Sequence, residues 1–207
     1  MCGRFYIPDE GGLEALIDLL NRAEAKQQKK QPAFRLKRGE ICPGDAAAVL
    51  APDRSRQPSA FVMRWGFWMD NRLVFNARSE TAAQKPLFRD SLRIRRCAIP
   101  AAAFFEWDHR VKKPLKFRFW PEGSPMMYLA GLYRFEPNAP LPVFTVLTRQ
   151  AQGNIADIHD RMPVILNEEQ LDSWLHQEQD PFQIIDQEPP VLACQQEEAL
   201  LPLLTSL

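Results

Sequence analysis

Cys2 is the first residue of the chain that could carry out chemistry. It follows Met1 directly in the stretch MCGRF, and cells usually remove an initiator Met when the next residue is as small as Cys. Cys2 would then carry a free α-amine and a thiol on adjacent carbons, a 1,2-aminothiol that no other position in a protein offers. The alternative is that Cys2 is a small residue at a tolerated place, and its position alone leaves both interpretations open.

A second group of polar residues interrupts the apolar pattern in FNARSET (75–81). Asn76, Arg78 and Glu80 alternate there with apolar or small neighbours, and this period of two predicts that all three lie on one face of a strand. An Asn and an Arg that face a cavity can hold a carbonyl group or a phosphate. The alternative is that they cap a helix, which the letters SETAA suggest.

Two further residues could transfer protons. Glu106 stands between Phe105 and Trp107 in AFFEWD, so its carboxyl group either lies on a solvated face or is desolvated, with the raised pKa that a general acid or base needs. His159 precedes Asp160 where a polar turn enters an apolar strand, and an acidic neighbour can orient an imidazole for proton transfer. A structural carboxylate and an ordinary polar turn are the alternatives.

The elements that must position these residues are mostly strand-sized. Short apolar, β-branched or aromatic runs recur between turn residues, and 18 prolines favour bends and edge strands. Amphipathic patterns predict helices over residues 9–28 and 167–176. We therefore expect one α+β domain over residues 1–207, with mainly antiparallel strands in a barrel-like sheet, a few peripheral helices, and the acidic segment of about 167–207 at its periphery. The expected strands span residues 46–51, 60–65, 72–75, 97–100, 103–107, 117–120, 126–133, 143–148 and 162–166.

The charges are unevenly distributed along the chain although they balance overall, with 26 Lys and Arg residues against 26 Asp and Glu residues. No Lys or Arg follows Arg161, whereas nine Asp and Glu residues do. This division predicts a basic face that could meet a polyanion such as a nucleic acid, although the same charges could also be a solvated surface. The basic clusters lie at residues 26–30, 35–38, 93–96 and 116–119.

The composition argues against a membrane protein and against a metal site. No apolar run approaches the roughly 20 residues that span a bilayer, and the first residues contain no apolar signal segment. The cysteines at positions 2, 42, 97 and 194 form no CxxC pair, and the three histidines have no metal-ligand spacing. We therefore expect a monomeric cytoplasmic protein with no membrane partner, no metal and no cofactor.

Five sequence blocks, taken together, are similar to a known family. They are MCGRF, NARSET (76–81), RRCAIPAAAFFEW (95–107), FTVLTRQA (144–151) and IHDRMPVIL (158–166), in this order. The sequence resembles the SRAP family, named for SOS-response-associated peptidases, whose members cross-link covalently to abasic sites in DNA. Two regions depart from the family pattern. Glu40 stands in GEICPGD where members commonly have Asn, and the loop FWMDN (67–71) is shorter and lacks a Pro and a further Trp, which Trp68 could replace.

The resemblance implies a covalent reaction at the start of the chain. The ring-open form of an abasic deoxyribose presents an aldehyde, which only a neutral amine attacks. An α-amine with a pKa near 7.8 is roughly a quarter neutral at pH 7.4, against about one part in a thousand for a Lys side chain. The Schiff base would be reversible, and the thiol of Cys2 would then add to it and close a thiazolidine ring. Such a lyase-like cross-linking enzyme would shield abasic sites, mainly in single-stranded DNA.

The other site residues take their roles from this scheme. Glu106 would accept a proton from the α-ammonium group or hold that group in place. His159 would assist the opening of the sugar ring and proton transfer at the departing hydroxyl, and Asn76 would orient the terminus or the sugar. Salt-sensitive DNA contacts without sequence preference are expected from Arg4, Arg78, Trp68 and Lys85, with Thr148 helping to line the site.

Two other functions fit the same residues. One is a peptidase or self-processing hydrolase, with Cys2 as an N-terminal nucleophile and His159 or Glu106 as its base. The other is a non-covalent reader of modified or single-stranded DNA, which would use the basic face and the Trp residues. Survival of the complex on a denaturing gel separates covalent from non-covalent binding.

Overall fold

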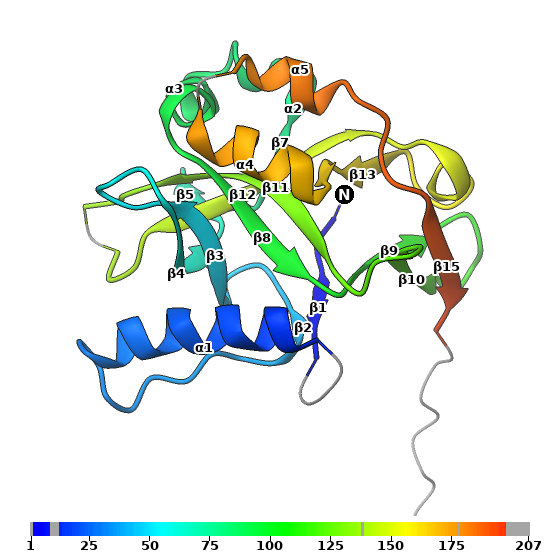
Figure 1. Cartoon of the computed structure of the whole chain (residues 1–207). Coiled ribbons are helices and arrows are strands. Elements are labelled where there is room, and N and C mark those ends of the chain that lie inside the picture. The colour runs from blue at the N-terminus through cyan, green and yellow to red at the C-terminus, as the bar shows by residue number, and fades with distance from the viewer. Residues whose placement is uncertain (1, 9–12, 138, 178, 198–207) are drawn as a thin grey trace, which may run out of the picture.

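Two β-sheets that lie beside each other form the body of the molecule, with helices on the outside (Figure 1). The computed structural model describes residues 2–8, 13–137, 139–177 and 179–197. Within these residues the sheets are mostly antiparallel, as short strands joined by turns would favour.

The larger sheet has eight strands and curls into a ring. The ring closes because β11 pairs with β12 as well as with β8. Neighbouring strands of the ring are antiparallel except for β12 and β4, which run parallel. In order around the ring, the strands are β12 (Val143–Gln150), β4 (Pro58–Trp65), β3 (Ala46–Pro52), β8 (Arg96–Ala101) and β11 (Met127–Arg134). Attached to them are β7 (Asn76–Arg78), β13 (Arg161–Pro163) and β14 (Ile165–Leu166).

A buried Trp fixes the chain segments that meet inside the ring. The ring of Trp65 stacks on that of Phe144 at a centroid distance of 6.0 Å, and the ring of Phe5 approaches it at 5.1 Å. Its indole N–H donates a hydrogen bond of 2.9 Å to the carbonyl oxygen of Phe75, which satisfies the buried polar atom. Trp65 therefore holds β1 and β12 against the residue that directly precedes Asn76.

The second sheet carries the start of the chain. It has five strands in the order β15 (Leu192–Gln196), β10 (Leu115–Pro121), β9 (Ala103–Asp108), β1 (Phe5–Ile7) and β2 (Gly39–Ile41), and all its pairs are antiparallel. A separate two-stranded ribbon consists of β5 (Phe67–Met69) and β6 (Arg72–Val74).

Helices cover the ring from two sides (Figure 1). One is α1, which packs on β3 and β4 and buries an apolar stripe that includes Leu16 and Leu20. The other is α4, which packs on β8 and β14 and starts with a reciprocal capping box between Asn167 and Gln170. The helices are α1 (Glu14–Gln28), α2 (Ser79–Ala82), α3 (Pro86–Ile94), α4 (Glu168–His176) and α5 (Pro181–Ile185), with a 3₁₀ turn η1 (Gly153–Ile155).

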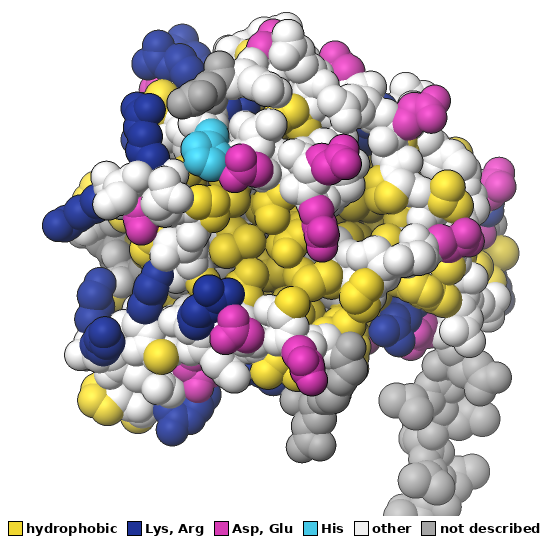
Figure 2. All heavy atoms as spheres, viewed as in Figure 1, with side chains coloured by type: hydrophobic (Ala, Val, Ile, Leu, Met, Phe, Trp, Pro, Cys, Tyr) yellow, Lys and Arg dark blue, Asp and Glu magenta, His cyan; other side chains and the backbone are white. Residues whose placement is uncertain are grey.

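Charged side chains are unevenly distributed over the face seen in Figure 2. Lys and Arg side chains gather along the left edge of Figure 2, over α3 and the left end of α1, and Asp and Glu side chains lie mainly to the right and above. A hollowed apolar area lies between α1 and α4 in the same view. No helix among the residues that the structure describes is long and apolar enough to cross a membrane.

The expected fold class is confirmed: the molecule is α+β, with mainly antiparallel strands, a barrel-like sheet and peripheral helices. The strand expected over 162–166 is divided into β13 and β14. The helix expected over 9–28 is observed from Glu14, and residues 9–12 of that expectation lie outside the described residues. Of the acidic segment expected at the periphery, residues 198–207 also lie outside them.

One expectation for the polar stretch was wrong. Asn76 and Arg78 belong to β7, but the strand ends at Arg78 and Glu80 lies in α2. The three side chains therefore do not share one strand face, because the chain turns into a helix after Arg78. Neither Asn76 nor Arg78 caps that helix with its side chain.

Candidate active site

The pairing of β1 with β9 directs the start of the chain toward Glu106. Phe5 lies opposite Phe104 in this antiparallel pair, and the Phe105 N–H donates a hydrogen bond of 2.9 Å to the Arg4 carbonyl oxygen. Residues that precede Phe5 therefore run alongside those that follow Phe104. Backbone hydrogen bonds thus bring Cys2 to the part of β9 that carries the carboxyl group.

Cys2 is held from two sides and is fully buried. Its carbonyl oxygen accepts a hydrogen bond of 2.9 Å from the side-chain amide of Asn76, and its sulfur lies 4.0 Å from the Arg4 carbonyl oxygen. Burial, and then the negative charge of Glu106, raise the pKa of the Cys2 thiol well above its usual range. The thiol is therefore neutral at physiological pH in this arrangement.

Asn76 is placed by the backbone of the strand before and beside it. The Phe75 carbonyl oxygen accepts hydrogen bonds from the Trp65 indole at 2.9 Å and from the Val146 N–H at 3.1 Å. From there β7 runs parallel to β12, with Asn76 opposite Val146. The hydrogen bonds from Trp65 and Val146 thus fix the backbone before Asn76, and this backbone determines where the Asn76 amide points.

Glu106 lies on the inner face of β9 because the strand alternates. Phe104 and Glu106 point inward, and Phe105 and Trp107 point to the other face. Only 2% of Glu106 is exposed. Burial is the main cause that raises the pKa of its carboxyl group to about 7. At neutral pH the group can therefore both accept and return a proton.

His159 faces Glu106 across a short gap. Its Nε2 lies 3.9 Å from Glu106 Oε2, which is longer than a direct hydrogen bond. Burial lowers the pKa of His159, so we assign the neutral ring. The Arg161 N–H donates a hydrogen bond of 2.9 Å to Nδ1, which leaves the ring proton on Nε2, facing the carboxyl group. Asp160 Oδ1 also lies 2.9 Å from Nδ1, but that carboxylate is 82% exposed and water screens its charge.

Arg161 joins the segments behind the site. Its guanidinium binds both oxygens of Glu80, at 2.6 and 2.9 Å, and donates a further bond of 2.6 Å to the Thr148 carbonyl oxygen. The hydrogen bonds from Arg161 lower the pKa of Glu80 to about 2. Thr148 is itself fully buried, and its hydroxyl lies 3.5 Å from the Ala77 carbonyl oxygen. Thr148 therefore lies below the surface, and its role in lining the site stays a prediction.

The residues expected to contact DNA are distributed around the site. Arg4 forms a salt bridge of 2.9 Å with Glu40 and lies over the Trp107 ring at 5.2 Å. Arg78 is exposed at the end of β7, two residues after Asn76. Lys85 is exposed before α3. Arg4 and Arg78 thus each follow a residue of the site by two positions: Arg4 follows the buried Cys2, and Arg78 follows Asn76.

Trp68 lies apart from Cys2, Glu106 and His159. Its side chain is 58% exposed on β5, and β5 and β9 stand on opposite sides of Figure 1. Within the described ranges, no hydrogen bond or ring contact joins Trp68 or Lys85 to Cys2, Glu106 or His159. Their roles in DNA binding stay predictions.

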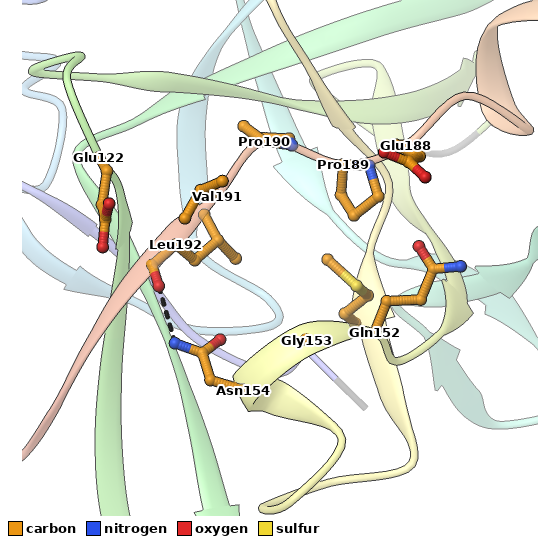
Figure 3. A pocket seen from close by; sticks show the side chains of 10 residues that line it. Glu122, Gln152, Gly153, Asn154, Glu188, Pro189, Pro190, Val191 and Leu192 are labelled. Atoms are coloured by element: carbon orange, nitrogen blue, oxygen red, sulfur yellow. Dashed lines mark hydrogen bonds between the residues drawn. The ribbon is translucent and has the colours of Figure 1, made fainter.

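A shallow cavity opens beside His159, and a larger one lies elsewhere. The first, of about 390 Å³, is lined by residues that include Trp107, His159 and Asp160. The second, of about 560 Å³, lies between η1 and the start of β15 and contains none of the residues expected to act (Figure 3). Its lining includes Glu122 and Glu188, whose charges do not suit a phosphate backbone. The first cavity therefore belongs to the candidate site.

Three residues of this region were not among the candidate site residues expected from the sequence. Trp107 connects the cavity with Arg4, Arg161 joins β12, α2 and β13, and Glu40 pairs with both Arg4 and Lys116. Sequence signals existed for each, because Trp107 and Arg161 stand inside the family-like blocks and Glu40 was noted as a departure from them. Their partners, however, are distant in the sequence.

Comparisons with known proteins agree on one family. A family model described as SOS response associated peptidase (SRAP) matches residues 1–198. The abasic site processing protein YobE of Bacillus subtilis is 38% identical over 191 residues, covering 85% of this chain and 82% of that protein. The abasic site processing protein YoqW of the same organism is 31% identical over 190 residues, covering 85% and 80%. A crystal structure of a protein from Bacteroides thetaiotaomicron has the same fold, with a TM-score of 0.76 at 17% identity, over 95% of this chain and 92% of that one.

Proposed function

The chain belongs to the SOS response associated peptidase family, and on this premise we propose that it captures abasic sites, mainly in single-stranded DNA, as a covalent adduct of Cys2. The relatives YobE and YoqW carry the name abasic site processing protein. In this proposal the protein acts as one domain over residues 1–207, as a cytoplasmic monomer without a metal or cofactor. Its partner is DNA that contains abasic sites.

The proposed reaction has two bond-forming steps. After removal of Met1, the neutral α-amine of Cys2 adds to the aldehyde carbon of the ring-opened sugar, and loss of one water gives an imine. The Cys2 thiol then adds across the C=N bond: its sulfur bonds to the imine carbon, its proton is carried by a base to the imine nitrogen, and a five-membered thiazolidine closes. Because amine and thiol belong to one residue, the second step is intramolecular and favoured by proximity.

The observation that carries the proposal is that Cys2 is held by a hydrogen bond from Asn76 and lies beside the buried carboxyl group of Glu106. The Asn76 amide holds the Cys2 carbonyl oxygen at 2.9 Å, and the charge of Glu106 acts on the thiol. This arrangement fixes the residue whose amine and thiol must both reach one carbon atom. A small residue without function would need no such support.

Glu106 and His159 would move the protons of this reaction. Glu106, whose pKa burial raises to about 7, can take a proton from the α-ammonium group and later from the thiol. His159 presents Nε2–H across the 3.9 Å gap, so it can donate a hydrogen bond to the sugar oxygen that departs on ring opening, while protonated Glu106 returns its proton to that oxygen. The reacting aldehyde would enter through the cavity beside His159.

The state of the thiol favours this reaction over peptide hydrolysis. A cysteine peptidase needs a thiolate, and its nucleophile has a lowered pKa. In this chain, burial and the negative charge of Glu106 raise the pKa of the Cys2 thiol instead. An amine-led reaction does not require the thiolate in its first step.

Intact-mass measurement tests the function directly. After incubation with an abasic oligonucleotide, we expect the protein mass to rise by the mass of the oligonucleotide less one water, starting from a chain that begins at Cys2. The same oligonucleotide with an intact base should give no shift. An unchanged mass with salt-sensitive binding would support the non-covalent reader instead, and a shortened chain without adduct would support the hydrolase.

Glu106→Gln should slow the reaction and stabilise the fold at neutral pH. The raised pKa means that the carboxyl group's contribution to stability is complete below about pH 4.5 and is lost as the pH rises through about 7. The neutral amide of Gln has no such loss. The free energy of unfolding of the variant should therefore rise relative to that of the parent protein as the pH increases from about 4.5 to about 7, by at most about 3 kcal/mol. Adduct formation at pH 7 should be slower by a factor of roughly 10²–10⁴.

Single-turnover kinetics and thermal unfolding across this pH range check both effects. Glu24→Gln is the matched control, because Glu24 is a partly buried carboxylate of α1 that accepts a hydrogen bond from Leu36 N, outside the site. It should react at the parent rate. A Glu106→Gln protein that also reacts at the parent rate would show that the carboxyl group is structural only.

A further inference from the structure

The outer face of the second sheet combines cations with aromatic rings. In the register of β9 with β10, Lys116 lies opposite Trp107 and Arg118 lies opposite Phe105. Directly opposite residues point to the same side of a sheet, so these four side chains share the face that points away from Glu106. The face belongs to strands that also carry the start of the chain.

The cations of this face lie over the rings. Lys116 Nζ is 4.0 Å from the centroid of the Phe105 ring. Arg118 Cζ is 4.9 Å from the Tyr6 centroid and 5.9 Å from the Trp120 centroid. Cation–π contacts of this kind hold side chains flat against a sheet, where they form a platform.

The charge of the platform is not balanced by its own carboxylates. Arg4 and Lys116 both pair with Glu40, one on each carboxylate oxygen. For Arg118, no carboxylate partner exists among the described residues, and its buried Nε has no hydrogen-bond partner there. Among the described residues, Lys116 and Arg118 of the platform and the neighbouring Arg4 thus share one carboxylate, and the surplus of positive charge is greatest at Arg118.

The platform is continuous with the candidate site. Trp107 lines the cavity beside His159 and also lies under Arg4 at 5.2 Å. From Lys116, opposite Trp107, the face extends along β10 to Trp120, about 13 Å at the usual rise per residue of a strand. A polymer that leaves the cavity past Trp107 would therefore meet Arg118 and Trp120 next.

We propose that this platform, made of Tyr6, Trp107, Lys116, Arg118 and Trp120, binds the single DNA strand that flanks the abasic site. The proposal rests on the proposed function and adds a second contact region to it. Aromatic rings stack with bases of any sequence, and interleaved cations bind the phosphates between them. Arg118 supplies for this purpose a guanidinium that has no carboxylate partner in the part of the chain that the structure describes.

Glu40 sets the affinity of the platform in the same proposal. Its carboxylate occupies the position between Arg4 and Lys116 that a phosphate group would otherwise take. A bound strand would compete with Glu40 for these cations. Glu40 therefore weakens contact with DNA.

Two variants of opposite expected effect test the proposal. Affinity is measured for abasic oligonucleotides that end next to the lesion and for ones extended on either side with single-stranded DNA. We expect extension on one side to tighten binding, Arg118→Gln to remove roughly a fivefold or larger part of that gain, and Glu40→Gln to increase it. The slope of log affinity against log salt should fall in magnitude by about 0.7 in Arg118→Gln.

Controls separate this surface from the reaction and from folding. Arg22→Gln removes an exposed Arg of α1 that pairs with Asp18, and it should leave the length dependence unchanged. Arg118→Lys keeps the charge and should restore the salt slope. If extension does not tighten binding, or if Arg118→Gln weakens short and long oligonucleotides alike, the platform proposal is wrong. In that case adduct formation with the shortest oligonucleotide still decides the proposed function separately.

Discussion

Cys2→Ala should abolish the heat-stable adduct with abasic DNA while it leaves salt-dependent DNA association within a few-fold of the parent. Besides the aldehyde carbon, the four other ring atoms of the thiazolidine (N, Cα, Cβ and Sγ) all come from Cys2, and alanine keeps the amine but has no sulfur. The variant can therefore form only a reversible imine. The cations expected to bind DNA, Arg4 and Arg78, remain in place, so phosphate contacts should persist.

A denaturing gel after heating checks this outcome, and a binding assay at several salt concentrations checks the association. Cys97→Ala is the matched control, because Cys97 is also fully buried but lies in β8 and has no contact with Asn76 or Glu106 among the described residues. It should form the adduct at a normal yield. Heat-stable adducts from a folded Cys2→Ala protein would exclude the thiazolidine.

Patterns within single strands were predictable from the sequence. The alternation of β9 places Phe104 and Glu106 on the inner side and Trp107 on the outer side. The sequence indicated the strand, and it left open whether the carboxyl group was solvated or desolvated. Asn167, the first residue of the stretch expected to be helical, caps α4. These features depend on neighbours in the chain, whose side-chain directions follow from a period of two or of 3.6.

Partners that are distant in the sequence were not predictable in the same way. Asn76 binds the carbonyl of a residue 74 positions away, and Arg161 binds a carboxylate 81 positions away. Glu80 was expected beside Asn76 on a strand, and instead its place in α2 brings it to Arg161. Such contacts follow from strand register and ring closure, which non-local pairing determines and local patterns do not reveal.

Glu40 also shows the difference between what the sequence predicts and what depends on contacts between distant residues. The sequence marked this position as unusual for the family, but only the structure shows that Glu40 lies between Arg4 and Lys116. Burial alone would raise the pKa of Glu40, but the hydrogen bonds from Lys116 and Arg4 lower it. The carboxylate is therefore ionised and competes with phosphate, which a count of basic residues does not predict.

A blocked N-terminus should abolish the adduct although every side chain is unchanged. An N-terminal tag that cannot be removed converts the α-amine of Cys2 into an amide, and so does a retained Met1, which lies outside the described residues. An amide nitrogen is neither basic nor nucleophilic, so no imine can form even though the Cys2 thiol persists. The same protein tagged after Leu207 keeps the free amine and should react normally.

The most direct test of the central claim is therefore a denaturing-gel comparison of these two tagged proteins with abasic single-stranded DNA, with mass spectrometry verifying each N-terminus. We expect a full yield of adduct from the protein tagged after Leu207 and none from the blocked one, with both binding DNA alike. Equal adduct yields from a protein whose blocked terminus is verified intact would contradict the reaction at the Cys2 α-amine.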